Sequence, residues 1–134
     1  MEESRLPSDW DWVTERHACS VRKFFERLRV GAESNVKTRK ALRLELVDRG
    51  PIEFVSAGDT FSVTRTMSPE GPYLTVRVIL AGQKIRFEVN GGDIAFEGAL
   101  TLTDKGECRL NVNGADLDVW QVLKRALEPI FFAS

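Results

Sequence analysis

Hydrophobic residues near the N-terminus recur at spacings of three and four, which predicts an amphipathic helix over residues 8–31. Ser8 is the expected N-cap, and Gly31 is the expected C-terminal stop, because glycine tolerates the left-handed conformation that often ends a helix. The apolar stripe that should face the core consists of Trp10, Val13, His17, Val21, Phe24 and Leu28.

From residue 41 to residue 113 the hydrophobic period changes to two, which is typical of strands with one buried and one polar face. Turn residues separate the runs, and the gaps are too short for crossover helices, so we expect an antiparallel meander. A sheet of this many consecutive hairpins should curve. We predict six to seven strands, near 41–48, 52–57, 60–67, 73–80, 84–90, 94–103 and 107–112.

The end of the chain predicts a second helix. Asn113-Gly114 should end the last strand, and a helix is expected over residues 115–128, packed on the sheet. Pro129 disfavours helical geometry before it, so residues 129–134 should form a separate tail. The side of this helix expected to cover the strands consists of Leu117, Trp120, Leu123, Lys124, Leu127 and Phe131.

Length and composition fit one folded domain. The chain has 134 residues, of which 43% are hydrophobic and 29% are charged. We therefore predict a single α+β domain over residues 1–134, with an N-terminal amphipathic helix, a curved antiparallel meander and a C-terminal helix. No apolar stretch approaches the ~20 residues that a membrane-spanning helix needs.

The expected location is the cytoplasm. Residues 1–5 are acidic and contain no apolar core, which is not the pattern of a secretory signal. Cys19 and Cys108 are the only cysteines, too few for a disulfide scaffold. A bridge between them is geometrically open, but it is not expected in a reducing compartment.

The net charge of -1 conceals a basic segment, residues 16–43. One interpretation is that this segment attracts an anionic partner; the interpretation we favour is that the protein's own acids neutralise it. Aromatic residues are not interleaved with its bases after residue 29, so nucleic acid is not the expected partner. The basic residues are Arg16, Arg22, Lys23, Arg27, Arg29, Lys37, Arg39, Lys40 and Arg43, against Glu26 and Glu33.

The sequence contains no catalytic constellation. His17 is the only histidine, which excludes a multi-histidine metal site, and we predict no metal and no cofactor. Cys19 lies about 200° from His17 around the predicted helix, so the two cannot form a nucleophile pair. We expect His17 to line the core with its ring nitrogens satisfied, and we keep it as a ligand-binding candidate.

Four other residues depart from the pattern. Arg65 shares strand parity with Phe61 and Val63 and should face the apolar layer, where it would need a partner. That partner is either a bound anion or an internal acid such as Glu97, unless the side chain extends its head to water. Trp12 points away from the helix stripe, and with Phe131 and Phe132 it is a candidate for an interaction surface.

These observations favour a non-catalytic binding or interaction module that self-associates, as a homodimer, or binds another protein. One alternative is a carrier of a small apolar or anionic ligand, held between the curved sheet and the helices, with Arg65 meeting a carboxylate. The other alternative is binding of an anionic partner through residues 16–43.

Overall fold

The computed structural model describes residues 11–42, 51–66 and 73–132. These residues form three helices and seven strands, an α+β fold as the hydrophobic pattern predicts. In chain order the elements are α1 (Trp12–Ala18), α2 (Val21–Ala41), β1 (Ile52–Ala57), β2 (Thr60–Thr66), β3 (Tyr73–Ala81), β4 (Lys84–Val89), β5 (Asp93–Leu102), β6 (Cys108–Val112), β7 (Ala115–Leu117) and α3 (Val119–Phe131).

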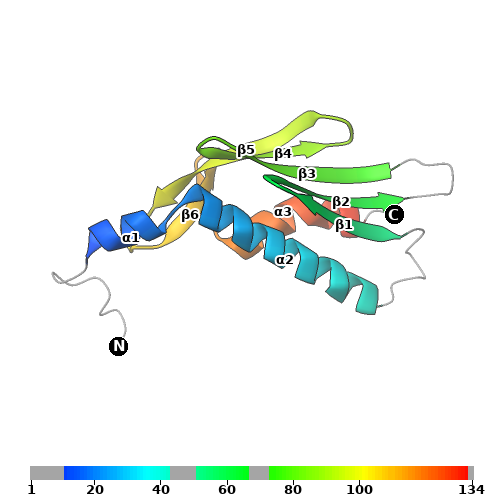
Figure 1. The fold of residues 1–134 in the computed structure, drawn as a ribbon, viewed down its shortest axis with the longest axis horizontal. Helices are drawn as coiled ribbons and strands as arrows, with labels where there is room; N and C mark the ends of the chain where they lie inside the picture. The colour runs from blue at the N-terminus through cyan, green and yellow to red at the C-terminus, as the bar shows by residue number, and fades with distance from the viewer. Residues whose placement is uncertain (1–10, 43–50, 67–72, 133–134) are drawn as a thin grey trace.

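The strands form one antiparallel sheet in which spatial order follows chain order from β1 to β7. The sheet is not closed into a barrel. Six of the predicted strands are found within two residues of their expected bounds, and β7 is an additional short strand. Helices α2 and α3 pack side by side on one face of the sheet, which Figure 1 shows, and their apolar side chains form one core with it.

The opposite face of the sheet is polar, and ion pairs cross its central strands. Arg77 lies 3.9 Å from Glu88, and Glu97 lies 3.5 Å from Arg86 and 3.8 Å from Lys84. Such cross-strand pairs of opposite charge support antiparallel pairing and neutralise the face locally.

The predicted single helix over residues 8–31 is wrong, because the chain breaks at Ser20. The Ser20 hydroxyl accepts a hydrogen bond from the Lys23 amide at 3.1 Å and so begins a new helix, α2. Helix α1 is capped separately by Asp11, and none of its residues is buried. The N-terminal half of the predicted apolar stripe therefore does not reach the core; residues 8–10 lie outside the described part of the chain.

Gly31 does not end α2, which continues to Ala41. The strand predicted at 41–48 therefore begins too early. Residues 43–48 of that predicted strand lie outside the described part of the chain. A Cβ atom at Gly31 would lie only 2.7 Å from Leu123 Cδ1 of α3. The glycine thus permits a close approach of two helices. Eight residues further along each helix, Arg39 contacts Phe131, so α2 and α3 run parallel.

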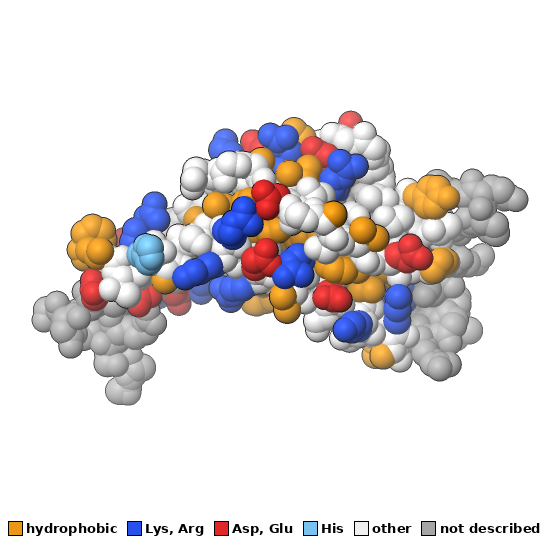
Figure 2. Space-filling model, in the orientation of Figure 1, with side chains coloured by type: hydrophobic (Ala, Val, Ile, Leu, Met, Phe, Trp, Pro, Cys, Tyr) orange, Lys and Arg blue, Asp and Glu red, His pale blue; other side chains and the backbone are white. Residues whose placement is uncertain are grey.

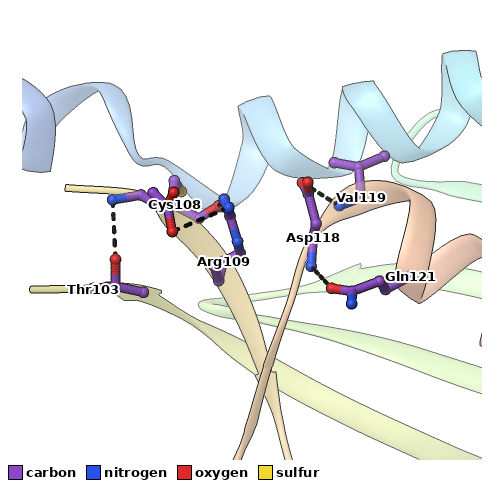
Figure 3. A network of polar contacts seen from close by, with 7 residues as sticks. Thr103, Cys108, Arg109, Asp118, Val119 and Gln121 are labelled. Carbon is purple, nitrogen blue, oxygen red and sulfur yellow. Dashed lines mark hydrogen bonds and ion pairs between the residues drawn. The ribbon is translucent and has the colours of Figure 1, made fainter. Parts of the chain in front are cut away.

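Helix α3 begins later than predicted. Asn113 and Gly114 have φ values of 53° and 90° and form a tight hairpin turn, so β7 occupies the first residues assigned to the helix. Asp118 then caps α3: its carboxylate accepts from the Val119 amide at 2.7 Å, and its own amide donates to Gln121 Oε1 at 2.8 Å (Figure 3).

Helix α3 also ends later than predicted, because Pro129 lies inside it. In the last turn this proline deprives only the Arg125 carbonyl of its helical donor. Burial of Ile130 and Phe131 offsets that loss, so residues 129–131 are helical and the predicted separate tail is wrong. Trp120 was expected on the buried side and is exposed; the buried side consists of Val122, Leu123, Ala126, Leu127, Ile130 and Phe131.

Cys19 and Cys108 form a disulfide, with their Cα atoms 5.4 Å apart. Cys19 is buried at the junction of α1 and α2, and Cys108 begins β6, so the bridge fixes this junction to the sheet. The expectation that both thiols remain unpaired is wrong. The sequence could not show it, because the two residues are 89 positions apart. No described helix is sufficiently long and apolar to cross a membrane.

Reduction of the disulfide should lower the free energy of unfolding by about 2–4 kcal/mol, because the bridge restricts a long loop in the unfolded chain. Urea unfolding of oxidised and reduced protein measures this difference. The double variant Cys19→Ser/Cys108→Ser is the control, and reductant should leave its stability unchanged. Two titratable thiols in the native, oxidised protein would contradict the bridge.

Gly98→Ala should destabilise the protein by about 1–3 kcal/mol, because a Cβ there overpacks the sheet. Strand β6 approaches this glycine closely, with Asn111 O 2.6 Å and Leu110 Cγ 2.9 Å from the added atom. Thermal unfolding measures the effect, with Ala99→Ser at the exposed neighbour as control. Equal stabilities would show that the strands separate more easily than the packing implies.

Candidate functional site

An apolar groove runs along the surface between the two parallel helices, with a volume of about 570 Å³. We call it the α2–α3 groove. Its α3 wall is hydrophobic, whereas its α2 wall presents small and polar side chains. The α3 wall consists of Val119, Leu123, Leu127 and Phe131, and the α2 wall of Gly31, Ser34, Asn35 and Thr38, with Leu42 at the end.

One edge of the groove is a row of four side chains, three on α3 and the fourth on its C-cap residue, which we call the α3 ridge: Trp120, Lys124, Glu128 and Phe132. They are spaced by four residues, so they follow one another along a single face of the helix. Trp120 is 62% exposed and Phe132 is 60% exposed. Between them, Lys124 Nζ lies 3.2 Å from Glu128 Oε1. Large exposed aromatic side chains at both ends of one row are the kind of surface used in protein contacts.

Two buried arginines hold the C-terminal end of α3. Arg39 of α2 donates from Nε to the Phe131 carbonyl at 2.9 Å, and Arg65 of β2 donates from a terminal nitrogen to the Ile130 carbonyl at 3.1 Å. The last carbonyls of a helix lack intrahelical donors and carry partial negative charge, so a cation is favoured there. The Arg39 guanidinium also lies 5.9 Å from the centre of the Phe132 ring.

Arg65 is fully buried, as its strand parity predicts. The structure pairs it with a backbone carbonyl of α3, and Glu97 contacts Lys84 and Arg86 instead. The expected alternatives were a bound anion, an internal acid such as Glu97, or water, and they did not include a helix end. The sequence does not predict the Ile130 carbonyl as this partner, because the prediction would require knowing that α3 continues past Pro129 and ends over β2.

The other predicted site residues are scattered. Trp12 and His17 are both exposed on α1, so His17 does not line the core, and neither lines the groove. Phe132 is exposed on the ridge, whereas Phe131 is 8% exposed and belongs to the core. Trp120 is the residue that sequence reasoning missed; its spacing of four from Lys124 was the available signal.

The basic segment does not form one patch. Arg39 is buried, Arg22 lies 3.2 Å from Asp59, and Arg29 Nε donates to Glu26 at 2.7 Å. Figure 2 shows basic and acidic side chains interspersed across the face that it draws. Exposed bases without an ion pair to another described residue are Arg16, Lys23, Arg27, Lys37 and Lys40; Arg43 lies outside the described part. Binding of an anionic partner here stays a prediction.

Among the described residues, no three side chains of histidine, cysteine, aspartate or glutamate meet in a group that could hold a metal ion. Comparison with known proteins gives no further guide, since no family model, curated protein or solved structure matches the chain.

Arg65→Met should lower the free energy of unfolding by about 1–3 kcal/mol, because the Ile130 carbonyl loses its buried donor while the apolar stem is retained. Urea unfolding measures the loss. Arg27→Met, on the exposed side of α2, is the matched control and should change stability little. If the two variants are equally stable, the buried guanidinium contributes no net stabilisation.

Proposed function

We propose that this chain is a non-catalytic interaction module that self-associates through the α3 ridge. The observation that carries the proposal is the order of side chains along the ridge: aromatic, basic, acidic, aromatic. When this row is placed against a second copy that runs in the opposite direction, each aromatic residue faces an aromatic residue and each charge faces the opposite charge. A second copy of the chain is therefore a partner whose charges and apolar groups match this surface.

A symmetric dimer uses the same surface on both copies, so that residue i of one contacts residue j of the other and the reverse also holds. If two α3 helices meet antiparallel about a two-fold axis between Lys124 and Glu128, Trp120 of each copy meets Phe132 of the other. The same operation places each Lys124 opposite the other copy's Glu128. All four contacts are favourable, which no parallel arrangement of the ridges provides.

The α2–α3 groove gives this contact its shape. Rows of side chains spaced by four on one helix pack into the grooves of another surface. The ridge of one copy would lie along the groove of the other, with its aromatic rings against Leu123 and Leu127 and its charged pair near the polar α2 wall. Because the two-fold axis passes between Lys124 and Glu128, the two charge pairs lie at the centre of this contact and the aromatic rings lie at its two ends.

The expected affinity is modest. Each of the four aromatic rings is already partly covered, so its burial contributes less than the ~1.5–3 kcal/mol of a fully exposed side chain. Association costs at least about 4 kcal/mol in lost freedom of motion. The surplus favours a reversible dimer with a dissociation constant in the micromolar range.

The cytoplasmic location remains a proposal. It was expected together with two unpaired thiols, and Cys19 and Cys108 are paired. A disulfide is typical of proteins in oxidising compartments. The redox state of Cys19 and Cys108 in the cell would therefore decide between the two locations.

Charge reversal tests the antiparallel pairing. Lys124→Glu alone, or Glu128→Lys alone, should weaken the dimer, because each places like charges opposite one another. An equimolar mixture of the two variants should associate again, because every cross-copy pair is then of opposite sign. Sedimentation velocity at micromolar concentrations measures both results. If the mixture does not associate better than either variant alone, the proposed pairing is wrong.

Trp120→Ser should abolish the dimer without unfolding the chain, because the Trp120 ring is exposed. Trp12→Ser is the matched control: Trp12 is 61% exposed but lies off the groove, so its loss should leave the dimer intact. Light scattering distinguishes the two. A wild-type protein that stays monomeric throughout the micromolar range would refute self-association.

A further inference from the structure

A second cavity, of about 370 Å³, lies on the other side of α3, between that helix and strands β3 to β5. It shares no residue with the α2–α3 groove. Its apolar walls are formed mainly by Leu74, Val76, Val89, Phe96 and Ile130. Cavities of this size with predominantly hydrophobic walls are typical of small-molecule sites.

Among the described residues that line this cavity, Arg125 carries the one charge, and none is acidic. The Arg125 guanidinium lies 5.0 Å from the centre of the Phe96 ring, a cation–π contact that places the positive charge over an apolar wall. Arg125 makes no ion pair with another described residue. Its donors are therefore available to an anion that enters the cavity.

Asn90 contributes further donors to the same cavity. Its side-chain Oδ1 accepts a hydrogen bond from the backbone amide of Thr75 at 3.0 Å, and its backbone amide donates to the Thr75 carbonyl at 3.0 Å. These two bonds fix the residue in its turn, where φ is 42°. With Oδ1 used, the Asn90 side chain offers its amide nitrogen, which can only donate.

We infer that this cavity binds a small molecule with an apolar body and a single carboxylate. Five hydrophobic side chains would surround the body, and the carboxylate would accept from Arg125 and from Asn90 Nδ2. One guanidinium matches the single charge and planar geometry of a carboxylate. A phosphate dianion would bring a second charge for which the described lining residues offer no partner.

The probe for this site is octanoate, with n-octanol as its neutral counterpart of equal chain length. Octanoate should bind the full-length protein, as measured by titration calorimetry and by amide chemical shifts of residues lining the cavity. Arg125→Gln should weaken octanoate binding at least about tenfold, because a charge-assisted hydrogen bond is lost. The same variant should leave octanol binding unchanged.

Two variants separate this site from general surface charge. Asn90→Asp keeps the acceptor for the Thr75 amide but replaces a donor by a negative charge, so it should weaken octanoate binding and spare octanol. Lys124→Gln removes one positive charge from the neighbouring position of α3, which faces the other groove, and should have no effect on octanoate.

Three results would overturn the inference: no saturable octanoate binding, equal losses in Arg125→Gln and Lys124→Gln, or chemical-shift changes confined to the α2–α3 groove. Because the two sites share no residue, the Trp120→Ser monomer should still bind octanoate. The experiments on the dimer and the experiments on this cavity can therefore fail independently of each other.

Discussion

The two buried arginines at the end of α3 are the constraint on which the rest of this structure depends. Helices α2 and α3 run parallel, so their C-terminal ends, both partly negative, lie close together. Arg39 and Arg65 bring positive charge to that point and donate to the last carbonyls of α3. They come from α2 and β2, so the same contacts tie two helices and the sheet together.

Fixing this end determines which side chains α3 presents. With the last turn helical, Ile130 and Phe131 are buried and Phe132 is left at the surface in line with Trp120. Along the helix axis the two rings are about 18 Å apart. The helix thus separates two surfaces: the ridge beside α2, with charges of both signs, and the cavity beside β3 to β5, with one arginine. Each surface suits a different class of partner.

The sequence predicts the strands well and the helix ends poorly, for physical reasons. Alternation from β1 to β6 depends on one sheet face being buried, which is a local property of each strand. Gly31 is different, because a glycine suits both a helix end and a close helix contact. Choosing between these requires the position of Leu123, far along the chain. Pro129 is similar. Its local preference to end a helix is overcome by the burial of the two residues that follow it and by the hydrogen bonds from two arginines that are distant in the sequence.

The candidate site was predictable only in part. The strand parity of Arg65 indicates a buried charge that needs a partner, but it does not indicate the backbone carbonyl of Ile130 to which Arg65 donates. Exposed aromatic residues were expected at Trp12, Phe131 and Phe132; Trp12 and Phe132 are exposed, Phe131 is buried, and Trp120 is exposed instead. The pairing of Cys19 with Cys108 depends on how α2 begins over β6, which no local pattern encodes.

Hydrogen exchange of single amides, followed by NMR, tests the arginine contacts most directly. In the wild-type protein the amides of Phe131 and Phe132 should be protected, because the last turn of α3 is held. In Arg39→Met and Arg65→Met these two amides should lose protection, while the Val122 amide at the other end of α3 keeps it. If Phe131 and Phe132 exchange at the rate of an unstructured chain in the wild type, or equally slowly in all three proteins, the arginines do not hold the helix end.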